Sequence, residues 1–270
     1  MDHGGLESTG NGRLNGEGSP NMAKKNLYLR TYENAEEQSK RGELIDLLHK
    51  CPIPQDQLLP NLGLFLDSKH LARMLLMDFL YRQIVDVQGV IIEFGTRWGH
   101  NLALFSALRG IYEPFNRHRK IIGFDTFTGF PSTSDKDKDW KAGQLAVTEG
   151  YETYLTRILE LHEALNPLAH IKKFELRVGD GSIEFAKYLE ESQETIVALA
   201  YFDFDIYEPT KKCLELVRPR LTKGSVVAFD ELNDLDAPGE TLALLEIFGL
   251  NQVRLKRFPH ASRVSYFVLE

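Results

Sequence analysis

The chain has 270 residues, a hydrophobic fraction of 43% and a formal net charge of −7, which is an ordinary composition for one large globular domain or two small ones. The negative charge argues against a protein that works by non-specific binding to nucleic acid or to an anionic membrane, and no apolar run approaches the ~18–20 residues of a membrane span. Two cysteines exclude a disulfide framework and a Cys-rich zinc site, and with no visible secretory signal we expect a reducing, cytoplasmic location.

The first part of the chain predicts a tail followed by a helical cap. Residues 1–23 are rich in Gly, Asn and Ser and carry few large apolar side chains, so we expect them to be disordered. Two helices are predicted next, over residues 36–49 and 68–86, within a cap that spans residues 24–88. The second helix carries apolar residues at the spacing of one helical face: Leu71, Met74, Leu75 and Phe79.

From residue 89 onward, short apolar runs alternate with helical stretches. The runs are rich in Val, Ile and Phe and mostly lack alternation with polar residues. This pattern is typical of strands buried on both faces, in a parallel sheet covered by helices. The predicted strands are residues 90–94, 121–124, 174–178, 196–202 and 225–229. The predicted helices between and after them are residues 101–109, 151–165, 182–190, 206–217 and 241–248.

The end of the chain predicts an antiparallel pair. The apolar runs at residues 252–257 and 263–269 lie too close together for a helix between them. The pattern as a whole predicts an open, doubly wound α/β sheet, with residues 24–270 as one domain and residues 89–270 as its α/β core. Residues 128–150 lack a strand or a helical period and exceed the usual loop length, so they are either a lid or a solvated excursion.

A glycine turn follows the first predicted strand. The strand ends in Glu93, and Gly95 and Gly99 come before the next helix. Ligands of doubly wound sheets bind at the carboxyl ends of the strands, where glycines let the backbone approach a ligand closely. An acidic residue suits a cationic group better than a pyrophosphate, and the dinucleotide and phosphate-loop glycine motifs are both absent. The same glycines would also suit a tight turn that binds nothing.

Acidic residues also follow the next two predicted strands. Asp125 ends the second strand, where a carboxylate can accept hydrogen bonds from two ribose hydroxyls. An aspartate in this position is also a frequent turn residue. Asp180 follows the third strand and could accept a hydrogen bond from an adenine amine, cap the next helix, or do both.

Four carboxylates follow the fourth and fifth predicted strands. Asp203 and Asp205 come after the fourth, and Asp230 and Glu231 after the fifth. Adjacent strands would bring these groups together at one edge of the sheet. Because like charges repel, the cluster indicates a bound cation, and oxygen ligands favour a hard ion such as Mg²⁺ or Ca²⁺ over zinc. Alternatively, some of the acids cap helices or face solvent, Asp205 in particular.

Together these features resemble the class I S-adenosylmethionine-dependent methyltransferases. Two segments are similar to motifs of the macrocin O-methyltransferase (TylF-like) family. Phe124-Asp-Thr-Phe-Thr-Gly-Phe-Pro131 resembles Asp-Thr-Phe-x-Gly-Leu/Phe-Pro, and Asp203-Phe-Asp-Ile-Tyr-Glu-Pro-Thr210 resembles Asp-Gly-Asp-Leu-Tyr-Glu-Ser-Thr. The resemblance spans residues 89–233.

The resemblance implies a Rossmann-like, seven-stranded methyltransferase sheet with S-adenosylmethionine as methyl donor and usually Mg²⁺ as a divalent cation. It also implies a small-molecule acceptor, often a hydroxyl of a sugar or another natural product, and a homo-oligomer. The general base would be Asp205, and the cation would lie on Asp203, Asp230 and Glu231. The donor would contact Glu93, Gly95, Thr96, Gly99, Asp125, Thr126, Asp180 and Asp203.

Two residues depart from the family pattern. Glu231 stands where the family usually has Asp, and its longer side chain could shift or remove one ligand. Phe204 stands where the family has Gly and could reshape the acceptor pocket. The alternatives are therefore a metal-independent methyltransferase, a non-catalytic relative, or another nucleotide-dependent enzyme with a Rossmann-type sheet.

Overall fold

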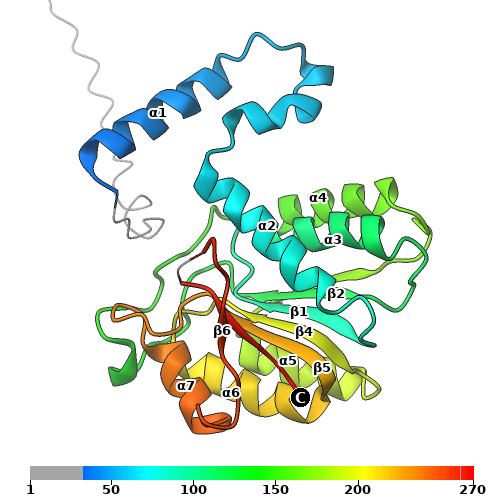
Figure 1. Ribbon diagram of the computed structural model, residues 1–270, viewed down its shortest axis with the longest axis vertical. Helices are drawn as coiled ribbons and strands as arrows, with labels where there is room; N and C mark the ends of the chain where they lie inside the picture. Colours follow the sequence, from blue (N-terminus) through cyan, green and yellow to red (C-terminus); the bar gives the residue numbers. More distant parts are fainter. Residues whose placement is uncertain (1–32, 262) are drawn as a thin grey trace, which may run out of the picture.

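The computed structural model describes residues 33–261 and 263–270, so the predicted tail of residues 1–23 lies outside the described part. Among these residues, seven strands form one sheet in the order β3-β2-β1-β4-β5-β7-β6 (Figure 1). The first five pair in parallel, and β7 and β6 add an antiparallel edge, as predicted. The strands are β1 (Val90–Phe94), β2 (Ile121–Asp125), β3 (Phe174–Val178), β4 (Val197–Phe202), β5 (Leu221–Phe229), β6 (Lys256–Arg257) and β7 (Ser265–Val268).

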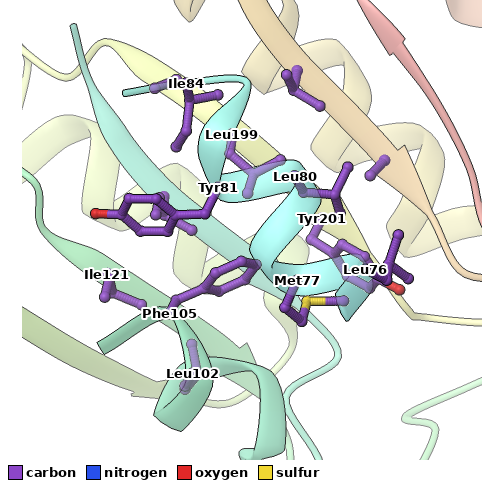
Figure 2. Close-up of a cluster of buried hydrophobic side chains, with 14 of the residues drawn as sticks. Leu76, Met77, Leu80, Tyr81, Ile84, Leu102, Phe105, Ile121, Leu199 and Tyr201 are labelled. Atoms are coloured by element: carbon purple, nitrogen blue, oxygen red, sulfur yellow. The ribbon is translucent and has the colours of Figure 1, made fainter. Parts of the chain in front are cut away.

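Helices cover both faces of the sheet. Successive strand residues point to opposite faces, so Ile91 packs in one buried cluster and Ile92 in the other. On the first face, Leu76, Met77 and Leu80 of α2 pack against strand and helix residues, as Figure 2 shows. This face carries α2 (Ser68–Arg82), α3 (His100–Tyr112) and α4 (Tyr151–Leu165), and the other carries α5 (Gly181–Glu191), α6 (Tyr207–Val217) and α7 (Gly239–Ile247).

The order of the strands places a crevice between β1 and β4. From β1 the chain proceeds outward to β2 and β3, and then returns to the other side of β1 for β4 and β5. Ligands of doubly wound sheets bind where the strand order reverses in this way. Phe94 pairs with Phe202, and Phe202 with Phe229, so the residues that follow these three strands lie at the same level of the sheet.

An arm, residues 33–67, precedes α2 and extends away from the sheet (Figure 1). It consists of α1 (Ala35–His49) and the 3-10 helices η1 (Gln55–Gln57) and η2 (Leu59–Phe65), and no residue of these three helices is buried. Asn34 begins α1 with a reciprocal capping box, because its side chain accepts from Glu37 N while the Glu37 carboxylate accepts from Asn34 N. Of the predicted cap, α2 therefore packs on the sheet and α1 does not.

Most element boundaries lie within one or two residues of the predictions, but α2 ends at Arg82 rather than at residue 86, and α3 extends to Tyr112 rather than residue 109. β5 begins at Leu221 rather than at residue 225. The sequence pattern missed its first four residues because they are exposed or half-buried and do not resemble a buried strand. β6 shrinks to two exposed residues, since it pairs with β7 alone at the edge of the sheet. Short 3-10 helices form at η3 (Asp135–Asp137) and η4 (Arg218–Arg220). No helix in the described part of the chain is long and apolar enough to cross a membrane.

Candidate active site

A cleft of about 390 Å³ lies over the carboxyl ends of β1, β4 and β5. Lys69 and Arg73 of α2 form part of its wall, and Phe130, Trp140 and Leu145 from the long loop between β2 and α4 form another. The loop predicted as either a lid or a surface excursion therefore borders the cleft. The predicted site residues that line it are Glu93, Gly95, Thr96, Asp125, Thr126, Asp180, Asp203, Asp205, Asp230 and Glu231.

The two glycines of the β1 turn have different roles. Both have positive φ angles, +89° at Gly95 and +74° at Gly99, which favour glycine. A Cβ at Gly95 would overlap the Asp203 carbonyl oxygen, so the ends of β1 and β4 touch through backbone atoms. A Cβ at Gly99 would overlap the Leu155 side chain of α4. Gly99 does not line the cleft, and it serves the packing of α3 against α4.

Glu93 is buried, with 1% of its surface exposed, borders the cleft and has one carboxylate oxygen without a hydrogen-bond partner in the described part of the chain. Its Oε1 accepts a hydrogen bond from Asn101 Nδ2 at 2.6 Å, whereas its Oε2 has no hydrogen-bond partner among the described residues. Burial raises the pKa of Glu93 to about 8. A cationic ligand group at Oε2 would stabilise the ionised carboxylate.

Asp125 organises the turns that border the cleft. Its Oδ2 accepts from Arg97 N at 2.7 Å, and its Oδ1 accepts from Phe127 N at 2.6 Å. A carboxylate oxygen has a second lone pair, so these bonds leave acceptor capacity toward the cleft. Thr126 donates from its hydroxyl to the Gly129 carbonyl at 2.6 Å, which closes the next turn.

Asp180 caps α5 and also lines the cleft. Its Oδ1 accepts from the Ser182 amide at 2.9 Å and from the Ser182 hydroxyl at 2.6 Å. Of the two roles left open by the sequence, the structure displays the helix cap. Thr96, in the turn after β1, has a buried hydroxyl oxygen that lies close to Gly123 of β2 and has no hydrogen-bond partner in the described residues.

The four carboxylates at the ends of β4 and β5 converge as predicted. Oxygen atoms of Asp203, Asp205 and Glu231 lie within 4.8 Å of one another, a spacing at which one metal ion can bind all three. Asp230 is not in this group, because its carboxylate accepts from the Tyr201 hydroxyl at 2.5 Å and from Arg73. The set of carboxylates that could share a cation thus contains Asp205 instead of the predicted Asp230.

Burial controls the protonation of this cluster. Burial, reinforced by the charge of Asp230, raises the pKa of Asp205 to about 7. The pKa values of Asp203 and Glu231 also lie well above their usual range, through burial and the neighbouring acids. Burial alone would raise the pKa of Asp230, but the Arg73 charge together with hydrogen bonds with Glu231, Tyr201 and Arg73 outweighs it and lowers the value to about 2. The cluster therefore favours a proton or a cation over full ionisation.

Three residues that the sequence patterns did not indicate complete the cluster. Arg73 of α2 donates to Asp203 at 3.3 Å and also to Asp230. Arg263, next to β7, donates to Glu231 Oε1 at 2.7 Å. Glu240 of α7 is fully buried and accepts from the amides of Phe204 and Glu231 at 3.1 and 3.2 Å. These residues lie on elements remote from the motifs, so no local spacing marks them.

Asp205 and Phe204 occupy unusual positions after β4. Asp205 is buried and adopts a φ of +60°, a left-handed conformation that Asp and Asn tolerate better than most residues. The Phe204 ring lies 5.6 Å from that of Phe94, and a Cβ on Gly181 would overlap it. Phe204 therefore forms the wall of the cleft between the acidic cluster and the start of α5.

Searches of protein-family models and of curated proteins found no match. Among solved structures, CalS11, described as a calicheamicin methyltransferase, is 42% identical, with a TM-score of 0.86 over 97% of this chain and 99% of CalS11. Another CalS11 structure, described as a TDP-rhamnose 3'-O-methyltransferase of calicheamicin biosynthesis, is 42% identical, with a TM-score of 0.79 over 88% and 96% of the chains. The O-methyltransferase NovP, at 17% identity, a TM-score of 0.52 and coverage of 73% and 79%, shares the fold.

The likeness to CalS11 covers the complete site, because it extends over nearly all of both chains. The acidic turns after β1, β2 and β4 and the two sequence motifs belong to this chain's own sequence, and the matched length is 97% of the chain. The chain belongs to the macrocin O-methyltransferase (TylF-like) family of S-adenosylmethionine-dependent methyltransferases.

Proposed function

We propose that this enzyme transfers the methyl group of S-adenosylmethionine to a hydroxyl of a sugar, assisted by a divalent cation such as Mg²⁺. The observation that carries the proposal is one cleft with two different ends. One end offers the unpaired oxygen of buried Glu93, and the other offers a group of convergent carboxylates that includes Asp205. The first suits the ammonium group of the donor, and the second suits an alcohol that must lose a proton.

The donor would lie along the turns that follow β1, β2 and β3. Glu93 Oε2 would accept from its ammonium group, with Gly95 and the Thr96 hydroxyl beside the amino-acid end. Asp125 has acceptor capacity for the ribose hydroxyls, and Asp180 lies beyond it on the side of the adenine.

The residues present fit a divalent cation. Asp203, Asp205 and Glu231 offer carboxylate oxygens close enough to share one ion, and Glu231 Oε2 is buried and receives no hydrogen bond from the described residues. Hard cations such as Mg²⁺ prefer oxygen ligands of this kind. When bound, such an ion lowers the pKa of a coordinated hydroxyl group. Glu231 in place of the family's usual Asp thus remains compatible with a ligand role.

Asp205 would act as the general base. In the cation-free site, burial raises its pKa to about 7. Asp205 would stay ionised beside a cation shared with Asp203 and Glu231, because the positive charge lowers this pKa, so that the carboxylate oxygen that is not on the cation can accept the proton. The acceptor hydroxyl gives its proton to the Asp205 carboxylate, and its oxygen forms a bond to the methyl carbon. The carbon–sulfur bond breaks, and its electron pair remains on sulfur, which yields S-adenosylhomocysteine. In-line positioning of the oxygen, carbon and sulfur supplies much of the rate.

The test is methyl transfer from ¹³C-methyl-labelled S-adenosylmethionine, followed by NMR. Because CalS11 is described as acting on TDP-rhamnose, that nucleotide sugar is the first acceptor, with methyl rhamnoside as an acceptor that lacks the nucleotide. We expect transfer to a sugar hydroxyl in the presence of Mg²⁺. Transfer that survives thorough chelation would remove the cation from the proposal, and saturable binding of NAD(P) without binding of S-adenosylmethionine would overturn the donor.

A further inference from the structure

Arg73 reaches from α2 into the carboxylate cluster and connects three separate elements. Its Nε donates to Asn101 Oδ1 on α3 at 3.2 Å, and its Nη2 donates to Asp203 Oδ2 at 3.3 Å. Its Nη1 donates to Asp230, and the guanidinium carbon lies 5.3 Å from the centre of the Tyr201 ring. The guanidinium fork has five N–H donors in a fixed plane, so it can fix several acceptors at once.

Asp203 takes part in two arrangements that compete through charge. It accepts from Arg73, and it is also one of the three carboxylates whose oxygens lie within 4.8 Å. A divalent cation on Asp203 would repel the guanidinium from that carboxylate. Asp230 is different, because it lies outside the three and is held by both Arg73 and Tyr201. Arg73 and a cation would thus compete for Asp203 and not for Asp230.

The arginines cannot replace the cation by charge alone. Arg73 and Arg263 donate hydrogen bonds to the cluster, and the charge of Arg97 also acts on Asp203 and Asp205. The arginines oppose five carboxylates, so negative charge remains in excess when these groups ionise. The carboxylates are those of Asp203, Asp205, Asp230, Glu231 and Glu240.

Arg73 also acts on the donor end of the cleft, through Asn101. The Asn101 side chain accepts from Arg73 and donates to Glu93 Oε1 at 2.6 Å. Asn101 is itself buried, with 4% of its surface exposed, so its orientation depends on these two partners. The guanidinium therefore fixes which way the carboxylate at the donor end points.

We propose that Arg73 is the internal counter-ion of the cation-free enzyme. It holds Asp203 until the divalent cation binds, and then releases Asp203 while it keeps Asp230 and Asn101 in place. Arg73 is a positioning residue for the donor and a competitor of the cation. This inference rests on the proposed cation and donor sites.

Arg73→Gln should change the binding of the two ligands in opposite directions. Without the competing charge, the donor-free enzyme should bind Mn²⁺ about tenfold or more tightly than the unmodified enzyme. Without the contact to Asn101, S-adenosylmethionine should bind about tenfold more weakly in the absence of metal. If Arg73 had a purely structural role, Arg73→Gln would bind both Mn²⁺ and S-adenosylmethionine more weakly.

The measurements are Mn²⁺ titration, with free Mn²⁺ followed by electron paramagnetic resonance, and calorimetry with S-adenosylmethionine in the presence of chelator. Arg82→Gln is the matched control, because Arg82 lies on the same helix and pairs with Asp78 outside the cleft. Arg73→Lys keeps the charge without the fork, so it should leave Mn²⁺ affinity within about threefold and still weaken donor binding. This variant supplies the test if Arg73→Gln does not fold, as judged by thermal unfolding.

Unchanged or weaker Mn²⁺ binding by folded Arg73→Gln would overturn the inference while leaving the proposed function standing. The same holds if Arg82→Gln tightens Mn²⁺ binding equally. If neither the unmodified enzyme nor Arg73→Gln binds Mn²⁺, the proposed cation fails as well. Tighter Mn²⁺ binding together with weaker donor binding, seen in Arg73→Gln and not in Arg82→Gln, supports the inference that Arg73 is the internal counter-ion.

Discussion

At the scale of single residues, Asp205 combines a functional carboxylate with an unusual backbone. Its φ of +60° is a conformation that Asn also adopts readily. Asp205→Asn therefore removes the charge with little strain. We expect kcat for methyl transfer to fall by about a hundredfold or more, while calorimetry finds donor affinity within about twofold. Turnover near that of the unmodified enzyme would show that another group takes the proton.

Glu93 predicts a pH dependence of donor binding. Its pKa of about 8 leaves the carboxyl mostly protonated at pH 6 to 7 in the donor-free enzyme. A ligand ammonium group binds the ionised form, so binding releases a proton and affinity should rise about tenfold from pH 6 to pH 7. Calorimetry in buffers of different ionisation enthalpy measures that proton. Glu93→Gln should bind weakly and without this dependence, and an equal pH dependence in that variant would contradict the assignment.

The raised pKa of Glu93 also sets how the stability of the fold depends on pH. The pKa of Glu93 is higher in the folded enzyme than its ordinary value of 4.5, so the fold binds a proton that the unfolded chain has lost. The stabilisation from that proton is present at low pH and is lost as the pH rises through about 8. A bound donor should remove much of this loss.

The acidic residues of the site could be predicted from the sequence more readily than the arginine that donates hydrogen bonds to them. Asp203, Asp205, Asp230 and Glu231 follow apolar strands, and strand ends meet at one edge whatever the details of packing. Arg73 belongs to a helix that begins the domain, and no pattern within that helix shows which residue reaches the sheet edge. Its contact with the cluster depends on how α2 packs, which is a tertiary property.

At the scale of elements, α7 holds the acidic turns through Glu240. The carboxyl group is fully buried, and it accepts from the Phe204 and Glu231 amides. Glu240→Ala would leave one buried and one partly buried N–H group without an acceptor, and we expect the free energy of unfolding to fall by about 2–4 kcal/mol. Urea denaturation measures the change. Glu215→Ala, at an exposed position on α6, serves as the control and should change it little.

Glu240→Gln separates hydrogen bonding from charge in the same experiment. Burial raises the pKa of Glu240 well above its usual range, so the native group is largely neutral and Gln is close to it in shape. We expect a smaller loss of stability than in the Ala variant. Equal losses in the two variants would show that the acceptor oxygens are not what Glu240 contributes.

Elements with strong periodicity were predicted well, and edge elements less well. β1 and α4 have the predicted bounds, because a buried strand and an amphipathic helix carry clear apolar patterns. β3 also has the predicted bounds, although it is an edge strand with alternating polar residues. For the loop of residues 128–150 the sequence left two roles open, a lid or a solvated excursion. Its position beside the cleft depends on contacts with residues far away in the chain. One such contact is the buried Asp137 carboxylate, which accepts from the Tyr207 amide at 2.6 Å at the start of α6.

At the scale of the whole molecule, the arm predicts an assembly of more than one chain. A helix of 15 residues without buried side chains is marginal on its own in water. Leu59 and Leu64 of the arm are 80% and 65% exposed, and Leu71 and Leu75 continue the apolar surface onto α2. We expect this surface to be covered by a second copy of the chain, because symmetric homo-oligomers are the commonest soluble assemblies.

The double variant Leu59→Glu with Leu64→Glu tests this assembly. Charges at these positions should oppose the burial of the surface, which yields a monomer in analytical ultracentrifugation while the unmodified chain sediments as a homo-oligomer. Leu165→Glu, at an 86% exposed position on α4, should not change the assembly. A monomeric unmodified chain, or equal dissociation in the control, would rule out the arm as the contact.

The absence of a side chain at position 95 has a consequence for turnover. Backbone of the first strand's tip abuts that of the fourth, and the Asp203 amide continues the pairing through its 2.8 Å bond to the Phe94 carbonyl. The carboxyl ends of β1 and β4 cannot separate without breaking the hydrogen bonds between the two strands. The segment that bears Trp140 borders the same cleft, so we expect exchange of spent nucleoside for fresh donor to depend on movement of that segment rather than on separation of the two strands.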